Sequence, residues 1–168
     1  MYLVEAKARI DNPDAIREVL LAGGAVLEDK NRHTDIYFRT PMGRFKLREG
    51  ERGSCLMYRE HPRKDMQALV RYDIEPIAGA ARVGAMLAMV GRRKVMLKNR
   101  EVYAFDRATV HLDNIHGLGS FLEIEVRVSD PAKAGEYALL CRDCMRRLGL
   151  DPASFETAGY DELLTRAA

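Results

Sequence analysis

Aromatic residues are scarce in this sequence, which has no tryptophan and only seven tyrosines and five phenylalanines among its 168 residues. Proteins that bind single-stranded nucleic acid stack the bases on aromatic side chains, so this scarcity disfavours a nucleic-acid-binding barrel. A large excess of one charge is also absent, because 27 lysines and arginines nearly balance 25 aspartates and glutamates. The chain therefore has no overall field that would attract nucleic acid or an anionic membrane.

Cysteines and long apolar runs are equally few. Cys141 and Cys144 form the one close pair of cysteines, a helical turn apart, and Cys55 stands alone. Because metal or redox partners for them are lacking in the sequence, we interpret all three as reduced thiols of a cytoplasmic protein. Charges at Glu5 and Lys7 interrupt the first residues as no signal-peptide core would allow, and no run approaches membrane-spanning length.

The sequence also lacks the G-x-x-x-x-G-K-[ST] pattern of a P-loop and any linker rich in proline or serine. The first absence excludes a P-loop mechanism, and the second predicts a single domain over residues 1–168. The four histidines are scattered, and we interpret each as a surface or hydrogen-bonded residue rather than as a metal ligand. His111 is the one that falls on a charged strand face.

Short segments of alternating apolar and polar residues dominate what is present. Strands are predicted at about 2–10, 25–39, 44–49, 54–60, 69–75, 93–99, 102–106, 108–114 and 120–128. Helices are predicted over 13–22, 77–90 and 130–148 and over the final YDELLTR segment. Eight or nine short strands with few helices favour a mainly antiparallel α+β fold that closes into a barrel with flanking helices, with a sandwich as the alternative.

The charged sides of these strands favour the barrel. If apolar side chains face outward, the opposite faces carry Glu5, Lys7, Arg9, Lys46, Arg48, Arg59, Arg71, Asp73, Glu75, Lys98, Arg100, His111, Asp113, Glu123, Glu125 and Arg127. Exposure to solvent would explain the polar face of any single strand. Taken together, however, so many apolar outer faces need helices to cover them, and the charged side is then enclosed.

An enclosed cavity with many lysines and arginines repels itself unless an anion occupies it. A triphosphate offers several oxygens that guanidinium groups bind in pairs. Clustered carboxylates suit Mg²⁺ or Mn²⁺, and these ions also bridge a protein to phosphate oxygens. The residues therefore predict a cavity that binds a triphosphate compound through a divalent metal.

Several motifs in order along the chain resemble the CYTH superfamily, the triphosphate tunnel metalloenzymes, and within it the class IV adenylyl cyclase-like branch. Leu3–Lys7 is similar to the E-x-E-x-K strand of the family, and Asp35–Phe38 to its D-x-Y-F motif. Val95–Tyr103 resembles V-x-K-x-R-x-x-Y, and His111–Glu125 contains the L-D and L-G-x-F-x-E-I-E elements. Tyr160–Leu164 resembles the Y-x-D-L-L ending. The resemblance implies an eight-stranded antiparallel tunnel.

The resemblance also implies roles for the charged residues. Metal ligands would be Glu5, Glu123, Glu125 and Asp113, with Mg²⁺ or Mn²⁺ as the cofactor. Phosphate would be bound by Lys7, Lys46, Arg48, Arg59, Lys98 and Arg100, to which the strand alternation adds Arg71. Glu5, Lys7 and Arg59 are the candidate catalytic residues, and a homodimer is expected.

Two residues depart from the family pattern. Leu3 stands where the family has a carboxylate that helps to hold metal, and Arg59 stands where it usually has lysine. Because arginine stays protonated, Arg59 cannot accept a proton. The leading hypothesis is the conversion of ATP into cyclic AMP and pyrophosphate. The alternatives are hydrolysis of inorganic or thiamine triphosphate, and a triphosphate-binding protein whose catalysis Leu3 has weakened.

Overall fold

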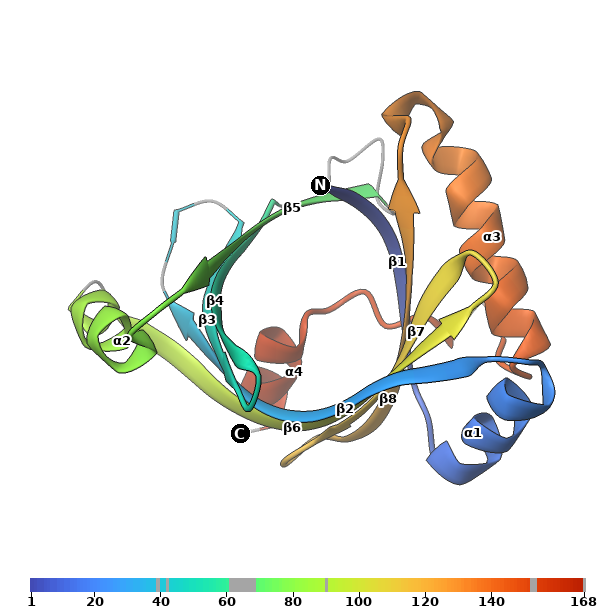
Figure 1. The fold of residues 1–168 in the computed structure, drawn as a ribbon, viewed down its shortest axis with the longest axis horizontal. Helices are drawn as coiled ribbons and strands as arrows, with labels where there is room; N and C mark the ends of the chain where they lie inside the picture. The colour runs from blue at the N-terminus through green and yellow to red at the C-terminus, as the bar shows by residue number, and fades with distance from the viewer. Residues whose placement is uncertain (39, 42, 61–68, 90, 152–153, 168) are drawn as a thin grey trace.

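The computed structural model describes residues 1–38, 40–41, 43–60, 69–89, 91–151 and 154–167. Its strands are β1 (Tyr2–Arg9), β2 (Val26–Phe38), β3 (Arg44–Gly50), β4 (Gly53–Arg59), β5 (Leu69–Ile77), β6 (Arg92–Phe105), β7 (Ala108–Ile115) and β8 (Gly119–Val128). Neighbouring strands are antiparallel, and the order β1-β5-β4-β3-β2-β6-β7-β8 closes on itself. The predicted closed eight-stranded barrel is thus confirmed (Figure 1).

One predicted boundary is wrong. The segments 93–99 and 102–106 were expected to be separate strands, but they form the single long strand β6. Arg100 and Glu101, which lie between the two predicted segments, continue the pairing with β2 and with β7. Arg100 pairs with Asn31 on one side and with Asp113 on the other, and its side chain lines the cavity inside the barrel.

The described residues form four α-helices, which flank or close the barrel. They are α1 (Pro13–Ala22), α2 (Ala80–Ala88), α3 (Ala134–Arg147) and α4 (Tyr160–Arg166), and the 3₁₀ turn Pro131–Lys133 leads into α3. The side chain of Asn12 accepts a hydrogen bond from the Ala15 amide at 3.1 Å and so caps α1, as its sequence predicts. None of the described helices is long and apolar enough to cross a membrane.

The main hydrophobic core lies outside the barrel wall. Leu122, Ile124 and Val126 of β8 alternate with charged residues and are buried, and they share a cluster with Tyr137 and Met145 of α3. Figure 1 shows α3 lying along the outside of the wall formed by β1, β8 and β7. Because this face is apolar and covered, the alternate residues of the same strands are directed into the barrel.

A second, smaller core closes part of the interior. Phe121 of β8 faces inward and meets Tyr160 of α4 edge-on, with ring centroids 5.2 Å apart. Tyr37, Met96 and Leu163 belong to the same buried cluster. Helix α4 therefore fills one part of the barrel interior with apolar side chains and leaves the charged part as a cavity.

Candidate functional site

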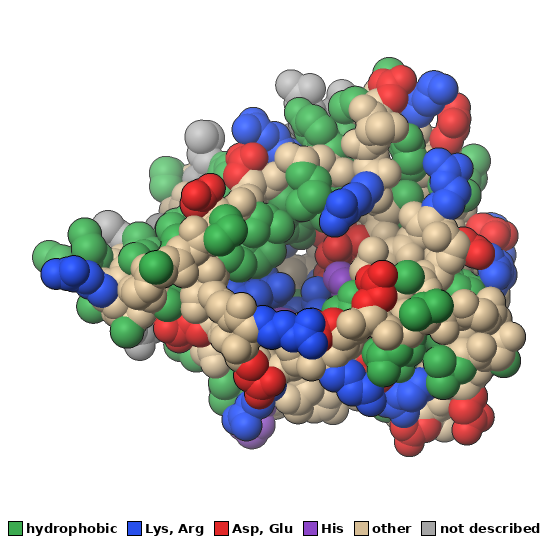
Figure 2. Space-filling view, in the orientation of Figure 1, with side chains coloured by type: hydrophobic (Ala, Val, Ile, Leu, Met, Phe, Trp, Pro, Cys, Tyr) green, Lys and Arg blue, Asp and Glu red, His purple; other side chains and the backbone are tan. Residues whose placement is uncertain are grey.

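The barrel encloses a cavity of about 620 Å³ that receives side chains from all eight strands and from the start of α4. Figure 2 looks into its mouth, where basic, acidic and hydrophobic side chains surround a hollow. The predicted site residues that line it are Glu5, Lys7, Lys46, Arg48, Arg59, Lys98, Arg100, Glu123 and Glu125. The structure thus brings together nine of the residues that sequence reasoning assigned to the site.

Arg71 is the predicted phosphate-binding residue that does not join them. Its guanidinium lies outside the barrel, 3.2 Å from Glu60 and 3.2 Å from Asp73, while Tyr72 and Ile74 line the cavity instead. The prediction that Arg71 faces inward is wrong because it assumed that every strand turns its apolar side outward. The outer face of β5 is exposed at Arg71, Asp73 and Glu75, so its charged residues are on the solvent side.

A buried aspartate organises the cations of β3. Asp35 of β2 is fully buried and accepts hydrogen bonds from Lys46 Nζ at 2.7 Å and from Arg48 Nε and Nη2 at 2.7 and 2.9 Å. Burial alone would favour the neutral acid, but Lys46 and Arg48 hold the pKa of Asp35 well below its usual range. The sequence placed Asp35 in a motif without giving it this role.

A second buried aspartate organises the cations of β6. Asp113 accepts hydrogen bonds from Lys98 Nζ at 3.1 Å, from Arg100 at 2.6 and 2.5 Å, and from the Tyr160 hydroxyl at 3.1 Å. Its predicted role as a metal ligand is not supported, because both carboxylate oxygens are engaged by these donors. Burial, together with the nearby charge of Arg100, lowers the pKa of Lys98 to about 7.

Glu5 and Arg59 form a third charged group on β1 and β4. One carboxylate oxygen of Glu5 pairs with Arg59, and the other accepts a hydrogen bond from the Tyr72 hydroxyl at 2.7 Å. Arg59 Nε also donates to the Tyr72 oxygen at 3.1 Å. Glu5 therefore fixes the position of the Arg59 guanidinium, and it lies outside the group formed by His111, Glu123 and Glu125 that is described below.

Lys7 lies deeper, between β8 and α4. Its ammonium donates to the Ala158 carbonyl at 2.6 Å and sits 4.3 Å from the centre of the Tyr160 ring. Lys7 pairs directly with Glu123 across the β1–β8 ladder. Burial lowers the pKa of Lys7, although the charges of Glu123 and Glu5 oppose this effect. Tyr160 thus links Lys7 to Asp113, a role that only the family-like ending of the sequence could have suggested.

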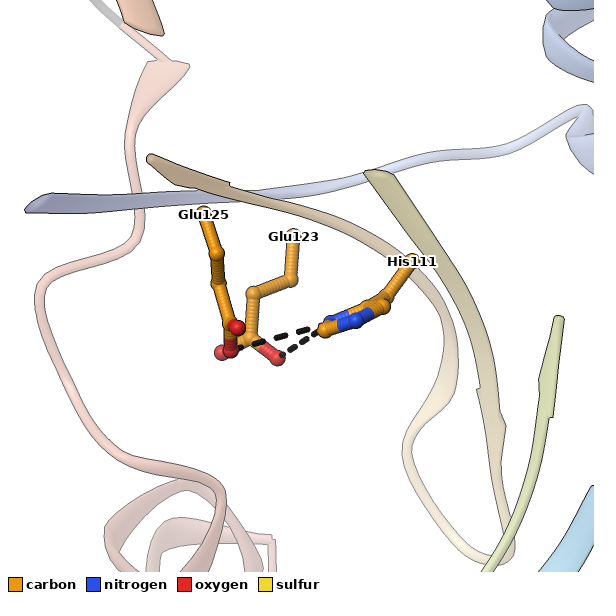
Figure 3. A group of neighbouring side chains, drawn as sticks. All are labelled: His111, Glu123 and Glu125. Carbon is orange, nitrogen blue, oxygen red and sulfur yellow. Dashed lines mark ion pairs between the residues drawn. The ribbon is translucent and has the colours of Figure 1, made fainter. Parts of the chain in front are cut away.

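Glu123 and Glu125 of β8 converge with His111 of β7 (Figure 3). His111 Nδ1 lies 3.6 Å from Glu123 Oε2 and 3.7 Å from Glu125 Oε1, and one ligand atom from each residue falls within a span of 4.8 Å. Burial favours the neutral acid at Glu123, but Arg100 holds its pKa well below the usual range; burial and the Glu123 charge raise the pKa of Glu125.

This group fits a divalent cation. Two carboxylates and an imidazole are common metal donors, and His111 Nδ1 is buried without a hydrogen-bond partner among the described residues. The interpretation of His111 as an ordinary hydrogen-bonded histidine therefore does not fit at Nδ1. The strand alternation had placed His111 on the charged face, and the spacing of two residues from Asp113 was the available signal.

Leu3 occupies the position at which the family pattern has a carboxylate. It lines the cavity, is 4% exposed, and lies on the same face of β1 as Glu5. Its partner across the ladder is Arg127, one step beyond the pair formed by Glu5 and Glu125. The position therefore belongs to the cavity wall, and it contributes an apolar surface there instead of an oxygen ligand.

Comparisons with known proteins agree with this fold. A Methanocaldococcus jannaschii protein named "Putative adenylate cyclase" is 29% identical over 173 residues, which cover 97% of this chain and 98% of that one. A Pyrococcus horikoshii structure has a TM-score of 0.85 at 24% identity and covers 96% of this chain and 98% of its own. A Hippeastrum protein described as having a dominant triphosphatase activity has a TM-score of 0.60 at 16% identity, with 98% and 94% covered.

A family model settles the relationship that the tunnel and its charged walls suggest. The model of the CYTH domain matches residues 1–160, which include all eight strands and the start of α4. Members of this family bind triphosphate substrates in such tunnels and use divalent metal ions. The chain belongs to the CYTH family.

Proposed function

We propose that the chain is a metal-dependent enzyme that converts ATP into cyclic AMP and pyrophosphate inside its tunnel. The observation that carries this proposal is the arrangement of opposite charges across one cavity. Strands β3 and β8 are four places apart in a ring of eight, so Lys46 and Arg48 stand across the cavity from Glu123 and Glu125. A triphosphate would be bound directly on one side and through a divalent ion on the other.

The cations of β3 and β6 would bind the phosphate oxygens. On β3, Lys46 and Arg48 share the single carboxylate of Asp35 and so keep excess positive charge for a ligand. On β6, Arg100 also pairs with Glu123 and the pKa of Lys98 is about 7, so a ligand would add to the positive charge there by favouring the ammonium of Lys98. The paired guanidinium and ammonium groups are held in place before a ligand arrives, which reduces the cost of ordering them on binding. Arg59, fixed by Glu5 and Tyr72, would extend this clamp along β4.

The acidic group would hold the cofactor. Glu123, Glu125 and His111 would supply the donors, and a divalent ion held there would neutralise negative charge that develops at the phosphate groups. Leu3 removes one donor that the resemblance would provide, so the metal site rests on β7 and β8 alone among the described strands.

Lys7 is the residue that we assign to proton transfer. In the reaction, the 3′ oxygen of ATP forms a bond to the α-phosphorus, the bond from that phosphorus to the β-phosphate oxygen breaks, and pyrophosphate leaves. The hydroxyl proton would pass to Lys7 in its neutral amine form, which burial favours by lowering the Lys7 pKa. Arg59 remains charged throughout and therefore serves as a clamp.

Chromatography of the products would test this function. The purified chain is incubated with ATP or with inorganic triphosphate, each with Mg²⁺ or Mn²⁺, beside Glu123→Gln and the outward-facing control Glu75→Gln. Cyclic AMP from the wild type and the control, but not from Glu123→Gln, is the expected result. If neither ATP nor inorganic triphosphate gives a product, the result would contradict an enzymatic role and favour a binding protein.

Hydrolysis is the second candidate, and the substitution at Leu3 favours it. A metal site with fewer donors would position an attacking sugar hydroxyl less strictly, while water needs no such positioning. The Hippeastrum neighbour is described as having a dominant triphosphatase activity. Inorganic triphosphate also presents the phosphate groups that the cations of β3 and β6 would bind. Release of phosphate without cyclic nucleotide in the same experiment would support this reaction and reject cyclisation.

A further inference from the structure

His111 has an unusual position for a buried histidine. The residue is 6% exposed, comes from the inward face of β7, and is directly paired with Glu123 across the β7–β8 ladder. Its Nδ1 atom has no hydrogen-bond partner within the described part of the chain. A buried polar atom without a partner costs stability. The position of Nδ1 beside two carboxylates is therefore best explained by a ligand that binds there.

The distances around Nδ1 distinguish a metal ligand from a hydrogen bond. At 3.6 and 3.7 Å, the separations from the two carboxylate oxygens exceed the range of a nitrogen–oxygen hydrogen bond. Two donors bound about 2.1 Å from one ion at angles of roughly 90° to 110° lie about 3.0 to 3.5 Å apart. The observed separations are close to this range, so a small contraction would let His111, Glu123 and Glu125 share one cation.

The chemistry of the donors then restricts the ion. Mg²⁺ prefers oxygen ligands and retains several waters, whereas imidazole nitrogen suits first-row transition ions. In this tunnel His111 offers a nitrogen beside the two carboxylates, while Leu3 offers no oxygen on β1. Glu5 does not restore that oxygen, because Arg59 and Tyr72 occupy its carboxylate.

We propose that His111 Nδ1 is a direct ligand of the tunnel cation and makes the site select Mn²⁺ and similar transition ions over Mg²⁺. The inference rests on the proposed function for the presence of a divalent ion, and it adds the nitrogen ligand and the class of ion.

Electron paramagnetic resonance of Mn²⁺ tests the ligand directly and needs no turnover. The full chain is stripped with a chelator and titrated with Mn²⁺ in the presence of inorganic triphosphate, and pulsed spectra are inspected for coupling to a directly bound ¹⁴N nucleus. His111→Gln removes the imidazole. His33→Gln is the matched control, because His33 is also a buried histidine on the cavity wall but belongs to β2, outside the cluster.

The wild type and His33→Gln are expected to show the ¹⁴N coupling, and His111→Gln is expected to lose it. Mn²⁺ affinity should fall at least about tenfold in His111→Gln, while Mg²⁺ affinity measured by competition changes less than about threefold. Thermal unfolding followed by circular dichroism confirms that the variant is folded, and an additional His111→Asn variant gives a second comparison if His111→Gln is not.

Three kinds of result would overturn all or part of the inference in distinguishable ways. Mn²⁺ bound without ¹⁴N coupling in the wild type, or coupling that persists without His111, rejects the nitrogen ligand and leaves the metal-dependent function standing. Failure of the wild type to bind Mn²⁺ even with triphosphate present rejects both this inference and the metal site of the proposed function. Equal losses of Mn²⁺ and Mg²⁺ affinity in His111→Gln would reject the selectivity.

Discussion

The cation walls and the acidic wall of the tunnel are built differently. On β3 and β6, each pair of cations shares one fully buried aspartate, Asp35 or Asp113. On β8, Glu123 has Arg100 as a partner, but Glu125 approaches His111 as its sole ion-pair partner within the described residues. The cation walls therefore carry internal counterions and form without a ligand, whereas the acidic wall is completed by a cation from solution.

Removing an internal counterion should have the largest effect on stability. Asp113→Asn removes the carboxylate that pairs with Lys98 and leaves Arg100 with Glu123 alone, and breaking a buried ion pair in this way costs about 3 to 5 kcal/mol. Urea unfolding followed by circular dichroism measures the free energy of unfolding. The exposed Asp73→Asn is the control and should change it by less than about 0.5 kcal/mol. A loss below 1 kcal/mol at Asp113 would show that its carboxylate is not needed as a counterion.

Neutralising the acidic wall should have little effect on stability and a large effect on metal affinity. Glu125→Gln removes a negative charge beside Glu123, and burial already raises the pKa of Glu125, so the metal-free protein should unfold at the same or a slightly higher urea concentration. Mn²⁺ affinity, measured by calorimetry, should fall by about tenfold or more because a direct donor is lost. Strong destabilisation with unchanged metal affinity would mean that Glu125 is a structural residue, as Asp113 is.

Leu3→Glu should make the β1 side of the tunnel resemble the acidic wall. The new carboxylate is buried beside Glu5, so the metal-free variant should lose about 1 to 3 kcal/mol of unfolding free energy, and Mg²⁺ should restore part of it. Catalytic rate with Mg²⁺ should rise if donors limit metal binding. Leu3→Gln carries no charge and should show neither response to Mg²⁺; an equal response of both variants would exclude metal binding at residue 3.

Sequence reasoning recovered the fold and most of the cavity because alternation in β1 and β8 is strict. It failed at β5, where apolar and charged residues alternate as regularly but the outer face lies in solvent. Asp113 was assigned to metal, since the sequence shows its charge but not that Lys98 and Arg100 occupy it. The three-dimensional neighbours of His111 were equally invisible. The homodimer, the single domain and the cytoplasmic location stay predictions.

The titration of Lys98 gives the prediction with the smallest expected effect, and it concerns the cation wall of β6. Its pKa is about 7 in the folded protein, against an ordinary value of 10.5, because burial and the charge of Arg100 disfavour the ammonium and the attraction of Asp113 offsets them only in part. Between these two values the unfolded chain binds more protons than the folded one. The contribution of Lys98 to the free energy of unfolding therefore rises as the pH increases from about 7 to about 10.5.

A bound triphosphate should reverse this preference, because its negative charge favours the ammonium and raises the pKa of Lys98. Binding measured at pH 8 should then take up a proton, and affinity should decline as the pH rises further. Calorimetry in two buffers with different ionisation enthalpies counts the protons. Lys98→Met should bind triphosphate more weakly and take up correspondingly fewer protons. Equal uptake by the wild type and Lys98→Met would assign the titration to another group, and the cation wall of β6 would then bind triphosphate with Lys98 already charged.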